Sequence, residues 1–260
     1  MKILVTNDDG IYAPGLWAAV EALRAVGEVV VVAPDREQSG AGTAISLNHP
    51  VRVTEVTPLA EGVKAYAVEG TPADSAILAL ESLIEDKKVD LVVSGINQGA
   101  NLGNDIFISG TVGAALQGFF RGIPSIAISV AALKDVHFAP AALVVRLLAQ
   151  DVADGKLTVP LLLNVNLPNQ PLEKIKGVSL THLGRRTYMD VVKDGDDGRR
   201  KYYWITREKP GWVLEKGLDI WVIRRRRISI TPIHTDLTAN HVSKSVGAMT
   251  RELRRALRPG

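Results

Sequence analysis

A series of short, continuous apolar runs, alternating with stretches of helical character, most constrains the fold of this chain. Runs that are apolar on successive residues, rather than on alternate ones, are typical of strands buried on both faces of a sheet. Strands that alternate with helices indicate βαβ units, and therefore a mainly parallel sheet. The runs that we predict to be strands are Lys2–Thr6, Glu28–Ala33, Asp90–Ser94, Pro124–Val130 and Leu161–Leu167.

Helix-start signals lie between these runs. Pro14 predicts the start of a helix that extends to about Val26, because proline is tolerated at the first helical position. Thr71 and Asp74 resemble a capping box, which predicts a helix through Ala76–Ile84. We also expect helices from Ser109 or Gly110 to Phe120 and over Pro140–Ala149, and an edge pair of strands at Val51–Val56 and Val63–Val68.

The pattern changes after Pro168. Between Arg185 and Arg227, clusters of Gly, Asp and Pro separate strand-like stretches, which predicts long hairpins rather than further βαβ units. The turn signals are Asp194–Gly198 and Lys209–Gly211, and the expected strands are Lys201–Thr206, Asp219–Ile223 and, after the hairpins, Ile228–Pro232.

These patterns predict an α/β protein. We expect a Rossmann-like, mostly parallel sheet with flanking helices over residues 1–183, and a protruding hairpin arm with a C-terminal segment over residues 184–260 that completes the single domain. A last helix near Val242–Leu257 carries one apolar stripe, which must be buried on its own subunit or exchanged between subunits. The stripe consists of Val242, Val246, Met249, Leu253 and Leu257.

Composition narrows the function classes. No apolar run approaches the roughly 20 residues of a membrane span, and the first residues do not resemble a signal peptide, so a cytoplasmic location is expected. The absence of cysteine excludes disulfides and thiolate metal sites. The net charge of +3 is too small to indicate nucleic-acid binding.

Basic residues are concentrated between Gly184 and Arg227, where 13 basic residues face 7 acidic ones and three of the four tryptophans occur. Basic residues interleaved with aromatic ones are one feature of RNA-contacting surfaces. The commoner explanation, which we favour, is a hairpin arm that packs against another subunit.

Polar, glycine-rich clusters follow the predicted strands. Ligands of open α/β sheets bind beyond the carboxyl ends of the strands, so we expect these clusters to converge at one edge of the sheet. The clusters are Asn7–Gly10, Asp35–Ser46, Ser94–Asn97 and Gln98–Thr111.

Asp8 and Asp9 are adjacent carboxylates at the end of the first strand. Two such charges are unfavourable unless a cation neutralises them, although a capping or turn role is the alternative. Magnesium, manganese and calcium prefer hard oxygen ligands, and Ser39 and Asn97 are candidates to complete the coordination. We therefore expect a metal-dependent enzyme that acts on an anionic, phosphorylated substrate, with Asp8 and Asp9 as its catalytic residues.

Ser109, Gly110 and Thr111 stand at a predicted helix start. Backbone N–H groups, two hydroxyls and the positive end of the helix dipole make this a candidate anion site, while an ordinary serine N-cap is the alternative. No Gly-Lys-Ser/Thr follows, so it is not a Walker A loop. Asn101, in the Asn- and Gly-rich loop before the helix, is a further candidate phosphate-binding residue.

Taken together, these loops resemble the SurE family of stationary-phase survival proteins, which are metal-dependent 5′-nucleotidases. The resemblance extends over essentially the whole chain, and the matching motifs occur in the family's order. They are ILVTNDDG (3–10), VVAPDREQSG (31–40), EGTPADS (69–75), SGINQGANLGNDIFISGTVGAA (94–115) and SITPIHTDLT (229–238).

The resemblance implies hydrolysis of nucleoside 5′-monophosphates, and in some members of 3′-monophosphates or short polyphosphate. It implies one divalent metal ion per subunit, magnesium or manganese ahead of calcium, and homodimers or homotetramers with an extended hairpin and an exchanged C-terminal segment. The corresponding metal ligands are Asp8, Asp9, Ser39 and Asn97, and the corresponding phosphate-binding residues are Ser109, Gly110 and Thr111.

Two positions depart from the family pattern. Ile108 stands where a tyrosine or histidine often precedes Ser-Gly-Thr, so any contact from that side chain is missing, and Ser75 replaces a frequent cysteine. Neither change affects the expected metal site.

Two other functions remain open at this point. A phosphatase of the haloacid dehalogenase type also has an acidic motif after its first strand, but its two aspartates are separated by one residue, whereas Asp8 and Asp9 are adjacent. A non-catalytic metal- or nucleotide-binding module would use the basic, aromatic arm for contacts. The roles of Asp8 and Asp9 are also open, since either can activate water or attack the phosphate directly.

Overall fold

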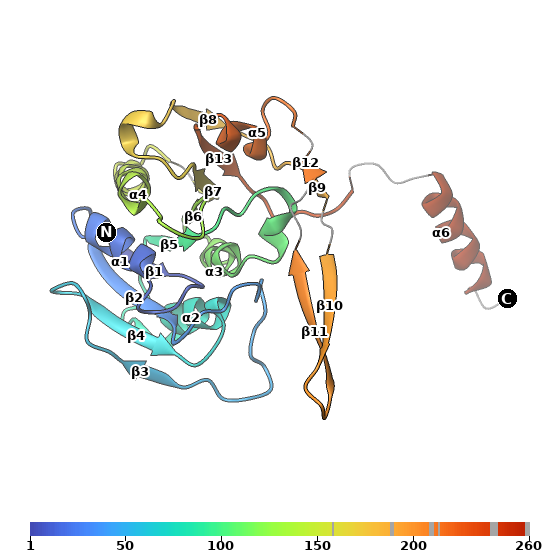
Figure 1. Ribbon diagram of the computed structural model, residues 1–260, viewed down its shortest axis with the longest axis horizontal. Coiled ribbons are helices and arrows are strands. Elements are labelled where there is room, and N and C mark those ends of the chain that lie inside the picture. Colours follow the sequence, from blue (N-terminus) through green and yellow to red (C-terminus); the bar gives the residue numbers. More distant parts are fainter. Residues whose placement is uncertain (158, 188–189, 208–210, 213, 240–243, 258–260) are drawn as a thin grey trace.

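The computed structural model describes residues 1–157, 159–187, 190–207, 211–212, 214–239 and 244–257. Within this part of the chain, a nine-stranded sheet has the order β3-β4-β2-β1-β5-β6-β7-β13-β8 (Figure 1). The strands are β1 (Lys2–Thr6), β2 (Glu28–Pro34), β3 (Val53–Glu55), β4 (Lys64–Val68), β5 (Leu91–Gln98), β6 (Ser125–Val130), β7 (Leu162–Leu167), β8 (Val178–Leu180) and β13 (Ile228–Pro232).

The sheet is mostly parallel, as predicted. Strand β1 pairs in parallel with β2 on one side and with β5 on the other. Only the short edge strand β3 and the strand β13 pair antiparallel within the described sheet, with β4 and β7 respectively. The next strand, β2, lies on one side of β1, and the later strand β5 lies on the other side. At such a reversal of strand order, the carboxyl ends of the strands border a crevice of the kind in which α/β proteins bind ligands.

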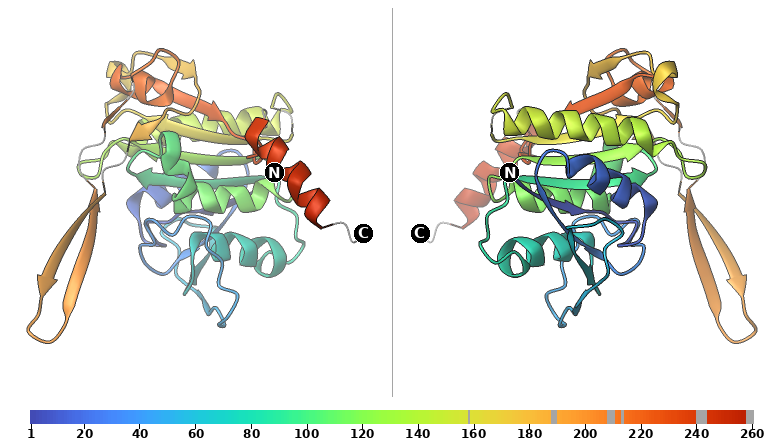
Figure 2. Two further views of the ribbon diagram at one scale, coloured as in Figure 1. Left: turned by 90° about the vertical axis from the view of Figure 1, so that its right-hand side faces the viewer. Right: turned by 90° about the vertical axis from the view of Figure 1, so that its left-hand side faces the viewer.

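Helices cover both faces of the sheet (Figure 2). Helices α1 (Pro14–Leu23) and α4 (Phe138–Ala153) pack against each other and against β5 on one face. Helices α2 (Pro72–Leu78) and α3 (Gly110–Phe119) pack together on the other face. Shorter elements are the π-helix η1 (Ala79–Leu83), the 3₁₀ helices η2 (Gly103–Phe107) and η3 (Leu172–Lys174), and helix α5 (Asp219–Arg224).

The continuous apolar runs have the expected physical cause. Successive strand residues point to opposite faces, so a strand covered on both sides needs apolar residues throughout. Ile3 and Val5 join the core under α1 and α4, whereas Leu4 joins the core on the side of α2. Ala127 and Leu162 meet Val112 of α3 in a third buried cluster.

The predicted helix starts are confirmed. The Thr71 hydroxyl accepts the Asp74 N–H at 3.0 Å, and a carboxylate oxygen of Asp74 accepts the Thr71 N–H at 2.9 Å. This is the capping box read from the sequence. At the start of α3, the Ser109 hydroxyl accepts the Val112 N–H at 3.2 Å.

One predicted strand is wrong. Residues Asp219–Ile223 belong to the helix α5, not to a hairpin. The apolar run is too short for its period to separate strand from helix, and a carboxylate in the first turn favours the helix because it meets free N–H groups there. The Asp219 carboxylate accepts the Ile220 N–H at 2.7 Å.

The remaining C-terminal elements follow the predicted pattern in part. Strand β11 (Lys201–Arg207) pairs antiparallel with β10 (Asp190–Asp196), around the predicted Asp194–Gly198 turn region. The short strands β9 (Arg186–Thr187) and β12 (Gly211–Trp212) pair beside it. Residues 209 and 210, two of the three residues of the second predicted turn, lie outside the described residues.

The last helix is α6 (Lys244–Ala256), drawn apart from the sheet in Figure 1. Of its predicted apolar stripe, Val246, Met249, Leu253 and Leu257 are exposed, and Val242 lies outside the described residues. None of the described helices has the length and apolar character needed to cross a membrane.

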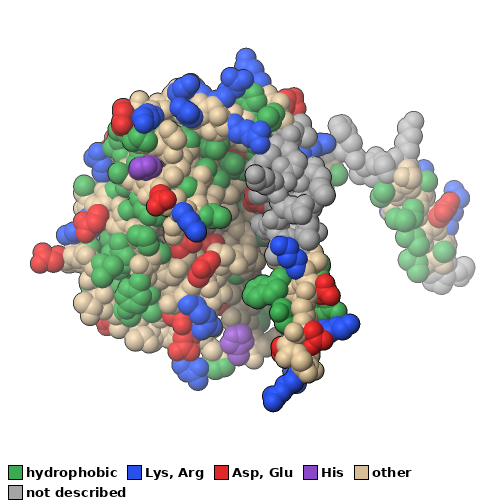
Figure 3. Space-filling view, in the orientation of Figure 1, with side chains coloured by type: hydrophobic (Ala, Val, Ile, Leu, Met, Phe, Trp, Pro, Cys, Tyr) green, Lys and Arg blue, Asp and Glu red, His purple; other side chains and the backbone are tan. Residues whose placement is uncertain are grey.

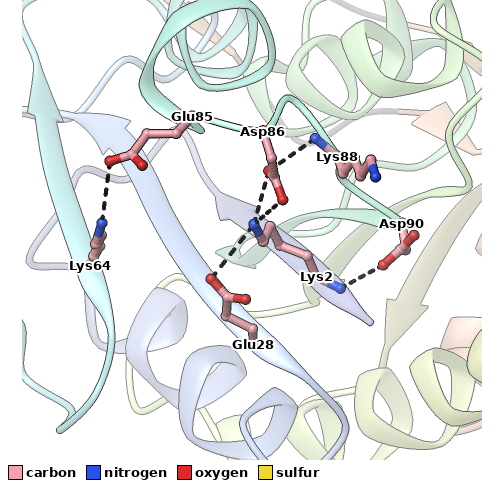
Figure 4. Close-up of polar contacts among 7 residues, drawn as sticks. All are labelled: Lys2, Glu28, Lys64, Glu85, Asp86, Lys88 and Asp90. Atoms are coloured by element: carbon pink, nitrogen blue, oxygen red, sulfur yellow. Dashed lines mark hydrogen bonds and ion pairs between the residues drawn. The ribbon is translucent and has the colours of Figure 1, made fainter.

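An ionic cluster joins the amino ends of the strands, opposite the edge where the polar loops meet (Figure 4). The Lys2 ammonium donates to both carboxylate oxygens of Asp86, at 2.9 and 2.8 Å, and lies 3.8 Å from Glu28. The Lys2 backbone N–H donates to Asp90 at 2.7 Å. These contacts hold the start of β1 against the start of β2 and the segment before β5.

Candidate active site

The turn after β1 is shaped by the residues that flank the two aspartates. The Asn7 side-chain amide donates to the Gly10 carbonyl at 2.9 Å, and its oxygen accepts the Gly10 N–H at 3.2 Å. Asn7 is fully buried, so this side chain replaces the backbone partners that the turn lacks. Asp8 and Asp9 are therefore held at the strand end by a local asparagine turn.

The loop after β2 meets both β1 and α3. The Gln38 N–H donates to the Asp8 carbonyl at 2.7 Å, and the Gly42 N–H donates to the Ile108 carbonyl at 3.1 Å. A Cβ at Gly113 would collide with the Gly42 carbonyl, so glycine at this position permits the loop to touch α3. The predicted cluster Asp35–Ser46 thus lies at the site.

Strand β5 extends further than predicted, to Gln98 rather than Ser94. Its register with β6 shifts between Ser94 and Asn97, and the Gly95–Ile96 peptide bond is cis. At the end of the strand, the Gln98 N–H donates to the Asp9 carboxylate at 3.1 Å. Asn97, the neighbouring residue, is buried beside this contact.

Helix α3 begins directly against Asp8. The Thr111 hydroxyl donates to Oδ1 of Asp8 at 2.6 Å. A Cβ at Gly110 would lie 2.7 Å from the Asp8 Cβ and 2.9 Å from Cγ of Pro72, which is closer than real side chains approach. Glycine at position 110 therefore lets the positive end of the helix dipole reach a buried carboxylate.

Burial disfavours the charged form of both aspartates, and at Asp9 the neighbouring Asp8 charge adds to this effect. Burial raises the pKa of Asp8, while hydrogen bonds from the Thr111 hydroxyl and backbone oppose the rise. Burial and then the neighbouring Asp8 charge raise the pKa of Asp9 to about 7. Neither residue belongs to any of the ion pairs found among the described residues.

This environment fits a divalent cation. Asp8 and Asp9 lack a positive partner in the described part of the chain, and Asn97 uses its amide N–H on the Gly99 carbonyl at 2.7 Å, which leaves its oxygen as a free acceptor. The exposed Ser39 hydroxyl donates to Glu37 at 2.7 Å and keeps its lone pairs. Two carboxylates with neutral oxygens suit a hard cation such as Mg²⁺ or Mn²⁺.

The donor set is small. The described residues contain no group of three His, Asp or Glu side chains arranged for a metal. A cation would therefore depend on the neutral oxygens of Ser39 and Asn97, on water and on substrate oxygens. Such a site keeps coordination positions open, as catalytic metal sites do.

The candidate phosphate-binding residues are placed around Asp8. The Ser109 hydroxyl is the N-cap of α3, and the Thr111 hydroxyl is bonded to Asp8. The Asn101 amide donates to Thr111 at 3.3 Å and to Ser129 at 3.0 Å. The side chains of Asn101 and Thr111 are thus engaged within the protein, so phosphate binding from these two positions stays a prediction.

Sequence reasoning missed three buried polar residues near this site. Asn164 and Asn166 are fully buried on β7 and contact Asn101. They had a signal, since two asparagines at alternate positions interrupt the otherwise apolar LLNVNL strand. Asp219 accepts the Gly103 N–H at 2.7 Å and the Gly184 N–H at 2.9 Å, and so ties η2 to α5.

The chain is similar to a known protein family over most of its length. A family model described as "Survival protein SurE" matches residues 3–190. The protein named 5′-nucleotidase SurE from Dehalococcoides mccartyi (strain CBDB1) is 49% identical over 239 residues, which cover 91% of this chain and 90% of the relative. That of Geobacter sulfurreducens is 46% identical over 248 residues, which cover 95% and 92% of the two chains.

A more distant relative and a solved structure agree. The 5′-nucleotidase SurE of Vibrio cholerae (strain El Tor Inaba N16961) is 42% identical over 253 residues, which cover 97% of this chain and 98% of the relative. The crystal structure of the SurE protein from Aquifex aeolicus superposes with a TM-score of 0.80 at 39% identity, and covers 96% of this chain and 100% of that chain.

Proposed function

Because the chain belongs to the SurE family, we propose that it is a 5′-nucleotidase, which hydrolyses nucleoside 5′-monophosphates to nucleoside and phosphate. The observation in this structure that supports the proposal is the pair Asp8 and Asp9. Asp8 is buried and Asp9 is half-buried at the crevice of the sheet, both without a positive partner among the described residues, and Asp8 contacts the first turn of α3. This environment suits a divalent cation and a phosphate group together.

In the proposed mechanism, Asp8 and Asp9, with Ser39 and Asn97, hold one divalent cation. When bound, this ion polarises the phosphoryl group and lowers the pKa of a water molecule. The amino end of α3, with Ser109 and Gly110, faces the phosphate oxygens through its backbone N–H groups. The chain thus orients the phosphate between the carboxylates and the helix end.

The two aspartates have different surroundings. Asp8 is buried and held by Thr111, whereas Asp9 is partly exposed. We therefore assign to Asp9 the orientation or deprotonation of the attacking water, and to Asp8 a fixed place beside the cation. Direct attack by an aspartate, with an aspartyl-phosphate intermediate, is the competing mechanism. Borohydride trapping during turnover distinguishes them, because it reduces an aspartyl-phosphate to homoserine, whereas direct water attack forms no such intermediate.

The proposal is tested by phosphate release from a panel of nucleoside 5′-monophosphates. The panel includes 3′-monophosphates and tripolyphosphate, which are the further substrates proposed here, and it is run with Mg²⁺, Mn²⁺, Ca²⁺ or EDTA. We propose Mg²⁺ or Mn²⁺ as the working ion and the cytoplasm, where nucleoside monophosphates occur, as the location. Absence of release from a folded protein with every metal would leave a metal- or nucleotide-binding module, a function that the named nucleotidase relatives do not favour.

A homodimer or homotetramer is part of the proposal. On β11, Tyr203, Trp204 and Ile205 are exposed, and hydrophobic side chains lie along both the hairpin and α6 in Figure 3. Apolar surface on two elements that lie apart from the sheet is expected to be covered by another subunit. Light scattering after size-exclusion chromatography tests this part by the molar mass.

A further inference from the structure

A row of buried polar side chains crosses the sheet toward the site. In the register of the sheet, Asn97 of β5 pairs with Ser129 of β6, and Ser129 pairs with Asn166 of β7. All three are buried. They lie on the face that α3 covers, next to the apolar cluster of Ala127 and Leu162. Polar groups at such positions cost stability unless they find hydrogen-bond partners.

The partner on β7 is the backbone of Asn101. The Asn166 side-chain oxygen accepts the Asn101 N–H at 2.9 Å, and its amide donates to the Asn101 carbonyl at 3.1 Å. The Asn164 amide donates to the same carbonyl at 2.7 Å. Two side chains thus satisfy both backbone groups of one loop residue and fix its position relative to the sheet.

The direction of the next contacts follows from donor and acceptor chemistry. A carboxylate only accepts, so the Thr111 hydroxyl gives its one hydrogen to Asp8, at 2.6 Å. Thr111 can then only accept from Asn101, whose amide lies 3.3 Å away and donates its other hydrogen to Ser129 at 3.0 Å. Donation therefore runs from Asn101 to Thr111 and from Thr111 to Asp8, while β7 holds the Asn101 backbone in place.

We propose that Asn164 and Asn166 are positioning residues for Asp8, acting through Asn101 and Thr111. This inference rests on the proposed function in taking Asp8 as a ligand of the cation. The hydrogen bond from Thr111 to Oδ1 then fixes the orientation of the Asp8 carboxylate, and with it the direction of the second oxygen. Partners that orient a metal ligand in this way change metal affinity or activity by about 10- to 100-fold when they are lost.

A purely structural role explains these asparagines poorly. The backbone hydrogen bonds between β7 and β6 do not require polar side chains at positions 164 and 166. Leu162, two residues before Asn164 on the same face of β7, is apolar and pairs with β6 in the same way. The buried side-chain oxygen of Asn164 has no hydrogen-bond partner, which costs stability. Residues that cost stability but hold a loop next to a catalytic carboxylate are typical of positioning.

The test uses Asn166→Leu, which removes the contact to Asn101 at similar side-chain volume, and Thr111→Val, which removes the hydroxyl at similar shape. Thr111→Ser keeps the hydroxyl and serves as the conservative rescue. The matched control is Thr181→Val. It removes hydrogen bonds of 2.8 and 2.7 Å to Ser229 and Thr231 in a buried polar cluster that β13 contributes to the same sheet, away from Asp8.

Three quantities are measured for each variant: the melting temperature, the Mn²⁺ dissociation constant by calorimetry without substrate, and kcat and KM for a nucleoside 5′-monophosphate. We expect Asn166→Leu and Thr111→Val to weaken Mn²⁺ binding and lower kcat by about 10- to 100-fold each, with KM changed by less than about threefold. Thr181→Val should retain the wild-type Mn²⁺ affinity and kinetic constants, although it melts lower. Thr111→Ser, which keeps the hydroxyl, should recover most of the Mn²⁺ affinity that Thr111→Val loses. The double variant should lose little more than either single variant, because both act on the same contact.

Wild-type Mn²⁺ affinity and kcat in a folded Asn166→Leu protein would overturn the positioning role, as would additive losses in the double variant. If Asn166→Leu does not fold, Asn164→Ser, which removes one donor to Asn101, gives the same comparison. A wild-type protein that binds Mn²⁺ but releases no phosphate would contradict the proposed function alone. The affinity series would then still decide whether β7 positions Asp8.

Discussion

The Thr111 hydroxyl lies 2.6 Å from Oδ1 of Asp8, and so joins the first turn of α3 to the end of β1, 103 residues earlier in the chain. Both residues are buried, and Gly110 packs against the same aspartate. The contact connects the predicted cation site with the predicted anion site. Small changes at the start of α3 are therefore expected to shift the position of the Asp8 carboxylate directly.

Gly110→Ala is the most direct such change. The new Cβ would lie 2.7 Å from the Asp8 Cβ and 2.9 Å from Pro72, so either the helix start or Asp8 has to move. We expect kcat/KM to fall by about 100-fold, a scale that misplacement of about 1 Å can produce. Gly247→Ala in α6, whose Cβ meets only Arg251 at 3.7 Å, is the control and should keep full activity. Equal activity of the two variants would show that the approach of α3 to Asp8 is unimportant.

The metal-free protein should become less stable as pH rises from about 4 to 7. The pKa of Asp9 is raised to about 7 by burial and the Asp8 charge, from an ordinary value of 3.8. In this range the folded state binds more protons than the unfolded state, so the free energy of unfolding falls with pH and levels off above pH 7. Asp9→Asn should reduce this slope, leaving the part that comes from the raised pKa of Asp8, and stabilise the metal-free protein at pH 8 by on the order of a few kcal/mol.

Urea unfolding at pH 5 and pH 8, for wild type and Asp9→Asn with EDTA, measures this difference. Mn²⁺ should restore wild-type stability at pH 8 but have a smaller effect on the variant, because binding to the folded state stabilises it. Parallel pH profiles of the two proteins would rule out an unneutralised Asp9.

Asp219→Asn should loosen the loop that leads into α3. The Asp219 carboxylate accepts N–H groups from Gly103, Gly184 and Ile220, all within 2.9 Å. An amide in its place turns one acceptor into a donor that faces a buried N–H group, which costs about 1–3 kcal/mol. Thermal unfolding should show the loss, while Asp236→Asn, which replaces a carboxylate that accepts the Thr238 N–H at an exposed site, should leave the melting temperature nearly unchanged.

Leu253→Glu tests the role of α6 in assembly. Leu253 lies on the exposed apolar stripe with Val246 and Met249, and a charge there opposes burial against another subunit. Light scattering should show a smaller molar mass for Leu253→Glu, and the wild-type mass for Glu252→Gln one position earlier. An unchanged mass for Leu253→Glu would place the subunit contact elsewhere.

The sheet was predictable because burial on both faces leaves a clear pattern. Lys2–Thr6 and Glu28–Ala33 were predicted as strands because alternate residues point to opposite faces, and both faces of this sheet are buried and need apolar residues. The structure has β1 and β2 at these positions. Asp219–Ile223 failed because its short apolar run fits either period, and the deciding contact from Asp219 to Gly103 spans 116 residues. A local pattern cannot contain such a contact.

The site was predictable as a convergence of loops, but not in its contacts. Because the carboxyl ends of neighbouring parallel strands meet at one edge of the sheet, Asp8 and the loop before α3 were expected to lie close together. The strand ends do not fix which face of α3 is turned toward β1, and so could not predict that Thr111 bonds to Asp8. Asn164 and Asn166 were visible as polar residues in an apolar strand, yet their partner is a loop backbone 65 residues away from Asn166.

The central claim is that Asp8 and Asp9 hold a divalent cation for hydrolysis of nucleoside 5′-monophosphates. Its most direct test is phosphate release with Mn²⁺ or EDTA, for wild type and for Asp8→Asn shown to be folded by its circular dichroism. We predict release that requires the metal in the wild type and falls by at least about 1,000-fold in Asp8→Asn, as expected when a group essential to the transition state is lost. Full activity of Asp8→Asn, or equal release in EDTA, would contradict the account.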